Sequence, residues 1–363
     1  MNHPELQSYM SAGIDRIVSN AKKAALKNPK ESLFLFRFAF SCRSAAKKRK
    51  ASEEKGEHIP PFLIASITSR CNLHCAGCYS RCTNATVDEA PVSQLIDKEW
   101  GRIFKEASSL GISFILLAGG EPMLRWDVIK EASKIKKIIF PIFTNGTIMG
   151  EEHFKLLDGN RNLLPIISIE GSRTATDSRR GEGVYDKLGG TMEQLNKKGI
   201  LFGASITITS DNINEVTSSE FLDGLAGKGC SVVVFVEYVP IDGKSENIAL
   251  GEAEKEYLKE RVNALRKQKE DMVYISFPGD EEYVGGCVAA GRGFFHINSH
   301  GGAEPCPFSP YSDINLKNSS LKEALSSKLF ERLRLEGLLS QPHKGGCVLY
   351  DKKSEIEALI ENK

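Results

Sequence analysis

Short apolar runs rich in β-branched residues alternate with polar, helix-like stretches through the middle of the 363-residue chain. This alternation is typical of repeated β/α units, in which a helix follows each strand of a parallel sheet. We expect strands at Phe62 to Ile67, Phe114 to Leu117, Ile138 to Phe143, Ile166 to Ile169, Ala204 to Ile208 and Val232 to Val239. The pattern predicts an α/β fold, a (β/α)6 partial TIM barrel, and a doubly wound sheet is the main alternative.

Basic and acidic residues are almost equal in number over the whole chain, but they are unevenly distributed along it. Lys plus Arg number 48 and Asp plus Glu 47, which argues against a surface built entirely for nucleic acid or anionic lipid. We expect three parts: a helical basic N-terminal arm at 1–58, the barrel at 59–245, and a linker helix with a small extension at 246–363. The arm has an apolar run, Leu33 to Phe40, followed by Lys47 to Lys50. It is expected to pack on the domain and end in a solvated linker, and the alternative is contact with an anionic surface.

Three of the nine cysteines lie within eight residues. The chain has no run of about 18 apolar residues and no apolar signal segment at its start, so we expect a cytoplasmic protein whose cysteines bind metal or react as thiols. Cys71, Cys75 and Cys78 are separated by three and two residues. Three thiolates on one compact loop suit a [4Fe-4S] cluster with one open iron. A zinc site completed by Cys82 or His74 is the alternative.

Polar residues and glycines follow the other expected strands. In parallel β/α barrels the active site lies at the carboxyl ends of the strands. The residues at these ends are Gly119, Gly120, Glu121 and Pro122, then Thr144, Asn145 and Gly146, then Ser168 and Glu170, then Thr207 and Thr209, then Glu237 and Pro240. Together with the cysteine loop they predict a single active site on one rim.

These motifs resemble the radical S-adenosylmethionine (radical SAM) superfamily over about residues 59–240. The resemblance implies that Cys71, Cys75 and Cys78 hold a [4Fe-4S] cluster whose fourth iron binds the methionyl amine and carboxylate of S-adenosylmethionine (SAM). It implies an enzyme supplied with an electron by a low-potential donor such as flavodoxin or ferredoxin. Reductive cleavage of SAM would give a 5′-deoxyadenosyl radical that abstracts hydrogen from an unactivated substrate carbon.

The resemblance also implies roles for the rim residues. The run Gly119 to Pro122 is similar to an element that binds the methionyl amine, because paired glycines allow close approach and a carboxylate accepts from an ammonium. Ser168 and Glu170 resemble a polar pair that meets the ribose and the methionyl group, and they are expected on one strand face. Arg180 is a candidate partner of the methionyl carboxylate or a solvated loop arginine. Further candidate cofactor or substrate contacts are Tyr79, Asn145, Thr207, Thr209 and Asn212.

One position departs from the family pattern. The family often has an aromatic residue directly before the third cysteine, where this chain has Gly77, and Tyr79 follows Cys78 instead. The departure leaves cluster binding intact but leaves the adenine contact open.

Cys287, Cys306 and Cys347 form a second group. The segment from Cys287 to Cys306, with Gly301 between them, resembles the opening of the SPASM and twitch extensions, which bind auxiliary iron–sulfur clusters. A complete SPASM module would have seven cysteines, so the resemblance implies a reduced, twitch-like domain with one auxiliary [4Fe-4S] cluster. Buried structural thiols are the alternative.

Several assignments stay open at this point. The fourth ligand of the auxiliary cluster is His343, Asp351, His300 or the substrate. Cys230 is expected in the core, Cys82 as a loop thiol, and Cys42 is unassigned. The substrate pocket between barrel and extension is expected around Glu237, Tyr238, Phe294, Phe295 and His296.

Three function classes compete. The leading one is a radical SAM enzyme acting on a small molecule, a lipid or a peptide. The first 58 residues are too short and too helical for the leader-binding segment of many peptide maturases, which favours a small-molecule, lipid or independently bound substrate. The others are an RNA- or membrane-associated modifying enzyme anchored by the basic arm, and a non-catalytic iron–sulfur protein. The rim motifs argue against the last, since a scaffold needs no SAM site.

Overall fold

The computed structural model describes residues 28–89, 93–241, 243–268, 272–340 and 347–361. Within them, nine strands form one sheet in the order β7-β6-β5-β4-β3-β2-β1-β8-β9. The strands are β1 Phe62–Thr68, β2 Phe114–Gly119, β3 Phe140–Thr144, β4 Leu163–Ser168, β5 Gly203–Ile208, β6 Val232–Glu237, β7 Val273–Phe277, β8 His296–Ile297 and β9 Ala303–Glu304. Strands β1 to β7 are parallel to their neighbours, β8 is parallel to β1, and β9 is antiparallel to β8.

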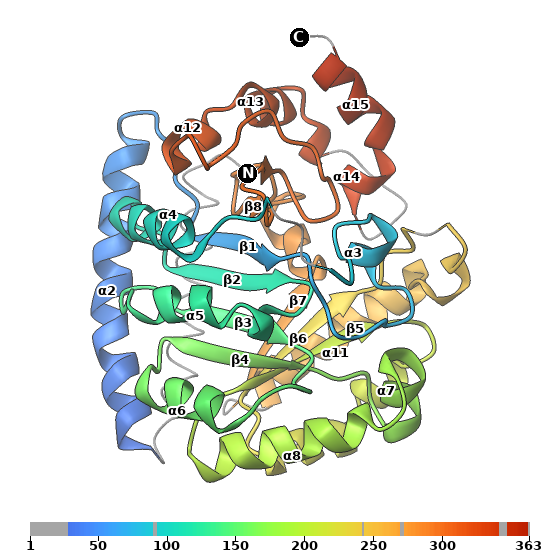
Figure 1. Cartoon of the computed structure of the whole chain (residues 1–363). Coiled ribbons are helices and arrows are strands. Elements are labelled where there is room, and N and C mark those ends of the chain that lie inside the picture. The colour runs from blue at the N-terminus through green and yellow to red at the C-terminus, as the bar shows by residue number, and fades with distance from the viewer. Residues whose placement is uncertain (1–27, 90–92, 242, 269–271, 341–346, 362–363) are drawn as a thin grey trace.

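Helices connect the parallel strands, as Figure 1 shows. They are α4 Asp97–Leu110, α5 Trp126–Ser133, α6 Glu151–Gly159, α7 Arg173–Arg180, α8 Val184–Lys197, α9 Ile213–Val216, α10 Ser219–Gly227 and α11 Glu252–Gln268. The C-terminal part holds α12 Leu321–Leu325, α13 Lys328–Leu335, α14 Val348–Asp351 and α15 Lys353–Glu361. Short 3-10 helices are η2 Pro122–Leu124, η3 Glu246–Ile248, η4 Gly279–Val284 and η5 Leu338–Ser340, and α3 is Tyr79–Cys82.

The core lies between the sheet and these helices. Helix α4 shows how the sequence builds it, because its buried residues recur at helical spacing and turn one face to the strands. Trp100 stacks on Phe104 of the same helix, and Phe104 meets Phe140 of β3 edge to face at 5.1 Å between ring centroids. Gly111, at φ +94°, ends the helix.

Helix α2 (Pro29–Glu53) lies at the amino ends of the strands, away from the rim with the predicted site (Figure 1). Near its start the buried Glu31 carboxylate pairs with Arg161 at 2.6 Å and accepts a hydrogen bond from Leu201 N just before β5. Further along, Phe38 meets Phe114, the first residue of β2, edge to face at 5.6 Å. The helix therefore covers the amino-end opening of the partial barrel.

The basic cluster Lys47 to Lys50 belongs to this helix, so the expected solvated linker is wrong at these positions. The Arg49 side chain is buried, and its guanidinium donates to Gly111 O and to Ser113 Oγ. The reason is that a buried carbonyl at the end of α4 needs a donor, and a guanidinium reaches it.

The fold class is confirmed, and the six expected strands are present with their bounds shifted by up to three residues. The sheet is larger than expected, because β7 extends one edge and β8 with β9 extends the other. Two-residue strands such as β8 leave almost no periodic signal in a sequence. Among the described residues, no helix has the length and apolar character needed to cross a membrane.

We expect Arg49→Met to lower the free energy of unfolding by about 1–3 kcal/mol, because the Gly111 carbonyl would stay buried without its donor. Chemical denaturation followed by circular dichroism measures this. Lys50→Met, one residue along on the exposed side, is the matched control and should change stability by less than about 0.5 kcal/mol. Equal stability of the two variants would contradict the anchoring role of Arg49.

Candidate active site

The loop after β1 holds Cys71, Cys75 and Cys78, all half-buried, and Cys78 is the N-cap residue of α3. Burial raises the pKa of the Cys71 thiol to about 11, so a metal would have to displace its proton. Gly77 lies in the left-handed region at φ +63°, and a Cβ there would lie 2.5 Å from the Tyr238 hydroxyl. The Tyr238 ring from the end of β6 thus occupies the space beside position 77, which explains why this chain has glycine where the family often has an aromatic residue.

The end of β2 fits closely against the start of this loop. A Cβ on Gly119 would lie 2.1 Å from Thr68 O, and a Cβ on Gly120 would lie 2.1 Å from Arg70 O and 2.9 Å from Cys71 N. The backbones are joined by hydrogen bonds from Gly120 N to Thr68 O at 2.9 Å and from Glu121 N to Arg70 O at 2.8 Å. Only glycine permits this approach, so the paired glycines position the cysteine loop.

The Glu121 side chain is 1% exposed and joins three neighbouring segments. Its carboxylate accepts hydrogen bonds from Thr144 Oγ1 and Asn145 N at 2.7 Å each, and from Met123 N at 2.9 Å in η2, which Pro122 begins. Burial raises the pKa of Glu121. Asn145 continues the network, because its amide donates to Asn72 Oδ1 at 2.8 Å in the cysteine loop. The hydrogen-bond partners of the Glu121 carboxylate in this structure are protein groups. Its expected contact with the methionyl amine of SAM stays a prediction.

Two arginines of α7 reach the cysteine loop. Arg179 Nε donates to Ala76 O at 3.1 Å, and Ala76 N donates to Arg179 O at 2.8 Å. Burial raises the pKa of Cys75, and the positive charges of Arg180 and Arg179 oppose this shift and favour the thiolate. The rim therefore carries positive charge on the side of the loop that α7 faces.

Glu170 orients these arginines. Its buried carboxylate accepts from Arg179 Nη1 and Arg180 Nε, both at 2.9 Å, and from Thr207 N of β5 at 3.2 Å. Strand β4 ends at Ser168, so Glu170 lies just beyond the strand while Ser168 stays half-buried at its end. The Asn212 amide donates to Glu170 O and Thr207 O and accepts from Thr209 N at 2.9 Å. These side chains join the ends of β4 and β5.

The structure brings the second cysteine group together. Cys287, Cys306 and Cys347 line a cavity of about 330 Å³. Its other lining residues are Glu237, Val239, Phe277, Pro278, Glu281 and Phe308. Backbone N–H groups lie close enough to lower the pKa of each thiol, although burial outweighs them at Cys287 and Cys306: Ala289 N at Cys287, Phe308 N at Cys306, and Leu349 N and Tyr350 N at Cys347. Such donors stabilise thiolates and are characteristic of cluster ligands.

The donor sets of both groups fit a cluster. The Cys306 thiol lies beside Cys347, and burial raises the pKa of Cys287 and Cys306. Across the described ranges, no three Cys, His, Asp or Glu side chains converge tightly enough to hold a single metal ion. An iron–sulfur cluster needs its thiolates farther apart than a single ion does, because the irons and sulfides fill the space between them.

Two aromatic side chains connect the two cysteine groups. Tyr79 directly follows Cys78, and its ring lies 4.9 Å from that of Phe308, which lines the second cavity. Burial raises the pKa of Tyr79. Tyr79 is therefore packed between the two candidate clusters.

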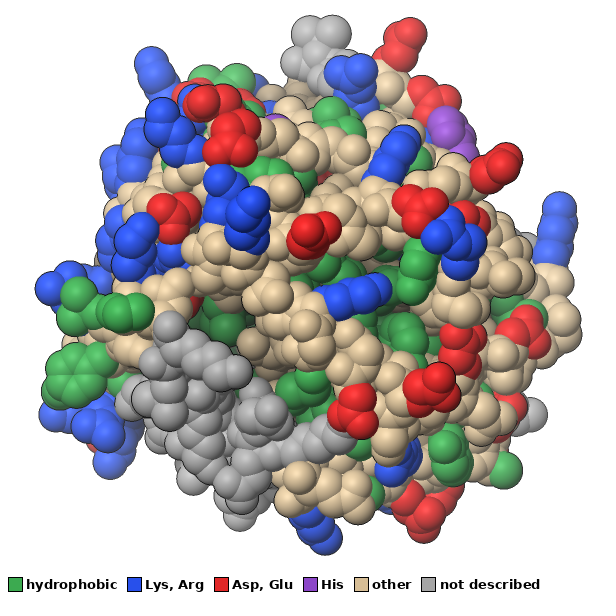
Figure 2. All heavy atoms as spheres, turned by 90° about the horizontal axis from the view of Figure 1, so that it is seen from below, with side chains coloured by type: hydrophobic (Ala, Val, Ile, Leu, Met, Phe, Trp, Pro, Cys, Tyr) green, Lys and Arg blue, Asp and Glu red, His purple; other side chains and the backbone are tan. Residues whose placement is uncertain are grey.

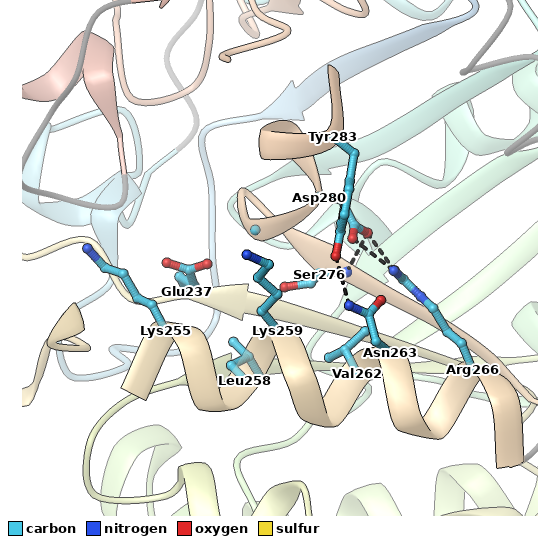
Figure 3. Close-up of a pocket in the computed structure, with 11 residues that line it drawn as sticks. Glu237, Lys255, Leu258, Lys259, Val262, Asn263, Arg266, Ser276, Asp280 and Tyr283 are labelled. Atoms are coloured by element: carbon cyan, nitrogen blue, oxygen red, sulfur yellow. Dashed lines mark hydrogen bonds and ion pairs between the residues drawn. The ribbon is translucent and has the colours of Figure 1, made fainter. Parts of the chain in front are cut away.

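A separate cavity of about 260 Å³ shares Glu237 with the cysteine-lined one. Figure 3 shows Lys255, Lys259 and Arg266 extending from one face of α11 toward Glu237 and Asp280. Arg266 binds Asp280 at 2.6 Å, whereas Lys255 acts on Glu237 through its charge. Burial raises the pKa of Glu237. Glu237 thus stands between a basic cavity and the second cysteine group.

Some expectations need correction. Phe294 and Phe295 are core residues at 1% and 0% exposure, and His296 pairs with Glu304 in β8 and β9, so these three do not form a substrate pocket. They lie there because β8 pairs with β1 inside the sheet. Cys230 is buried as expected.

The remaining cysteines and the fourth-ligand candidates are also placed. Cys42 lies on the buried face of α2, where it packs with Phe38 and Ile139, and Cys82 is exposed at the end of α3. His300 and Asp351 are not among the described residues that line the cysteine cavity, and His343 lies outside the described residues.

The sequence arguments missed two contacts at the site. Glu281 beside Cys287 and the Tyr79–Phe308 pair follow no motif or periodicity. Only the folded chain brings them to the cysteines.

Comparisons with known proteins agree with this geometry. Residues 65–223 match the family model of the radical SAM superfamily. AdoMet-dependent heme synthase of Methanosarcina barkeri is 26% identical over 301 residues, 76% of this chain and 85% of that protein. GTP 3′,8-cyclase of Clostridium perfringens is 25% identical over 328 residues, 83% of this chain and 96% of that protein. The solved structure of Streptococcus suis SuiB bound to S-adenosylmethionine matches with a TM-score of 0.68 at 17% identity, covering 83% of this chain and 76% of that one, which supports the fold.

We expect Gly120→Ala to lower iron binding by the Cys71 to Cys78 loop, because the added Cβ would collide with Arg70 O and Cys71 N. Iron content and visible absorbance after anaerobic reconstitution measure the loss. Gly189→Ala in α8, whose Cβ would meet nothing within 4 Å, is the matched control and should bind iron like the wild type. Full iron binding by both variants would rule out the positioning role of Gly120.

Proposed function

The chain belongs to the radical SAM superfamily, and on that premise we propose that it abstracts a hydrogen atom from an unactivated carbon of a small-molecule substrate. The cofactors of this enzyme are a [4Fe-4S] cluster and SAM. The cluster supplies the electron that cleaves SAM into methionine and a 5′-deoxyadenosyl radical. In this proposal Cys71, Cys75 and Cys78 hold the cluster.

One observation carries the proposal: a single hydrogen-bonded network joins the cysteine loop to the ends of β2, β3, β4 and β5. Gly120 and Glu121 tie the loop to β2, and Asn145 ties it to β3. Arg179 ties it to α7, and Glu170 links that arginine to β5. Such a network holds reacting groups in fixed positions, which radical chemistry requires.

We assign the SAM contacts to residues in or next to this hydrogen-bonded network. The backbone at Gly119 and Gly120, with Ser168 and Thr207 on the neighbouring strands, is proposed to line the SAM site. Arg180 keeps a cation beside the cysteine loop, which suits the methionyl carboxylate. Two aromatic side chains lie near this loop. Tyr79 directly follows Cys78 in the chain, and Tyr238 lies beside Gly77 in space.

We assign the auxiliary [4Fe-4S] cluster to Cys287, Cys306 and Cys347. The three thiols line one cavity, and backbone N–H groups lie near each of them, which supports this assignment. Tyr79 and Phe308, packed together between the two groups, make the auxiliary cluster a neighbour of the SAM cluster rather than a remote one.

A small molecule is the favoured substrate class. Two sequence relatives that align over most of the chain are named for reactions that involve a heme and GTP. A lipid or a peptide remains the alternative. We further propose a low-potential donor such as flavodoxin or ferredoxin, and a cytoplasmic location, since a reducing compartment keeps cluster thiolates available.

A second candidate partner is an anionic lipid surface, bound through the outer face of α2. Leu33, Phe36 and Phe40 are 51–57% exposed on this face, and Arg37 and Lys47 are exposed beside them. Figure 2 shows hydrophobic side chains with lysines and arginines beside them at the edge of the molecule where α2 lies. Helix α2 thus has apolar side chains on both its inner and its outer face. The inner face is buried against the barrel, and a lipid surface would bury the outer one.

We expect this protein to co-sediment with vesicles rich in phosphatidylglycerol at low salt and to be released by added salt, because lysines and arginines would face the lipid. Phe36→Ser with Phe40→Ser should weaken sedimentation several-fold, whereas Ser44→Ala on the same helix should not. Absence of sedimentation at low salt, or sedimentation that the phenylalanine changes do not affect, would contradict lipid binding by the outer face of α2.

The direct test of the enzymatic proposal quantifies 5′-deoxyadenosine after anaerobic reconstitution with SAM and a low-potential reductant. We expect the wild type to form it and the variant Cys71→Ala, Cys75→Ala, Cys78→Ala to form none. The wild type should bind about eight irons per chain and the triple variant about four, since each cluster holds four. Cys82→Ala is the matched control and should behave like the wild type. Equal product from the triple variant would contradict the proposal.

A further inference from the structure

The cavity with the second cysteine group has three thiols and two carboxylates, Glu237 and Glu281. Three cysteines leave one iron of a [4Fe-4S] cluster without a protein ligand. The residues that line the cavity therefore decide whether this iron is open to substrate or closed by the protein.

Glu281 is the carboxylate in contact with the cysteines. It belongs to η4, six residues before Cys287, and its side chain lines the same cavity as the Cys287 thiol, close enough for the two groups to interact. Its other contact fixes the side chain, because Oε1 accepts from Val288 N at 3.2 Å. The Glu281 charge also acts on Cys347 from the far end of the chain. The carboxylate thus lines the cavity of the three thiols, next to Cys287.

The backbone around Glu281 holds this position. Glu281 N donates to Pro278 O at 2.7 Å, and Gly286 N donates to Glu281 O at 3.2 Å. Cys287 N in turn donates to Leu339 O at 2.9 Å. The segment from Pro278 to Cys287 therefore forms one compact turn that presents the carboxylate and the thiol to the same cavity.

The charges of the site also favour a bound cation. Buried thiolates beside a carboxylate repel one another unless a positive centre lies between them. Arg292 is the neighbouring cation, and its guanidinium donates to Cys287 O while acting on Glu281 through its charge. One guanidinium balances part of this negative charge, and the irons of a cluster would balance the rest.

Glu237, the second carboxylate of the cavity, has different partners. It lies next to Gly279, and the positive charge of Lys255 in the basic cavity acts on it. No cysteine is among the groups that act on Glu237, although it lines the same cavity, which makes it a matched comparison for Glu281.

We propose that Glu281 is the fourth ligand of the auxiliary cluster and closes it with a carboxylate oxygen. The inference rests on the proposed auxiliary cluster at Cys287, Cys306 and Cys347. With Glu281 bound to the fourth iron, no iron of the auxiliary cluster is open, so the cluster does not bind substrate directly. Substrate would then lie on the Glu237 side of the cavity.

The test uses the full chain with Cys71→Ala, Cys75→Ala and Cys78→Ala, so that the auxiliary cluster is the only one present. After anaerobic reconstitution, iron content and the electron paramagnetic resonance spectrum of the reduced cluster are compared for Glu281, Glu281→Gln, Glu281→Cys and Glu237→Gln. We expect Glu281→Gln to shift the g values and to lose iron to a chelator about tenfold faster or more. Glu281→Cys should restore iron retention with the spectrum of an all-cysteine cluster, and Glu237→Gln should match the parent.

The outcomes separate the inference from the proposal beneath it. A parent protein that binds no iron would overturn the auxiliary cluster, and with it this inference. A parent with about four irons whose spectrum and iron loss are unchanged by Glu281→Gln would overturn Glu281 alone. Glu281 would also be overturned as the ligand if His343→Ala or Glu237→Gln, rather than Glu281→Gln, produced the change. Formation of 5′-deoxyadenosine by Glu281→Gln with the first three cysteines intact would establish that this variant folds.

Discussion

The close approach of two backbones at the end of β2 is the constraint on which the rest of the site depends. Gly119 and Gly120 lie so near Thr68 and Arg70 that a single added carbon would stand 2.1 Å from a carbonyl oxygen. This contact fixes where the chain leaves β1, and the cysteine loop starts at that point. Every later contact of the loop, with β3 through Asn145 and with α7 through Arg179, presupposes this starting point.

The two ends of the barrel have different tasks. At the amino ends, α2 closes the opening with buried ion pairs and hydrogen bonds, such as Glu31 with Arg161 and Arg49 with Gly111. At the carboxyl ends, charged side chains are used to orient loops, as Glu170 does for Arg179 and Arg180. Buried polar contacts thus stabilise the fold at one end and order the loops of the candidate active site at the other, which is the usual division in β/α barrels.

The sequence predicted those features that depend on local pattern. The alternation of apolar runs located six strands, and the spacing of Cys71, Cys75 and Cys78 predicts a cluster loop, because both signals are confined to short segments. Features that depend on distant residues were missed or misplaced. The two-residue strand β8 moved Phe294 and Phe295 into the core, and the helix α2 continued through the basic cluster because Arg49 meets a carbonyl about sixty positions away. Gly77 departs from the family pattern already in the sequence, but only the fold reveals Tyr238 beside it.

The central claim is that SAM binds the iron left open by Cys71, Cys75 and Cys78. Electron–nuclear double resonance of the reduced wild-type protein with SAM labelled with ¹⁵N at the methionyl amine tests it most directly. The account predicts a hyperfine coupling between that nitrogen and a cluster, lost when Cys75 is replaced by alanine. Labelled SAM that binds the clustered protein without any such coupling would contradict it.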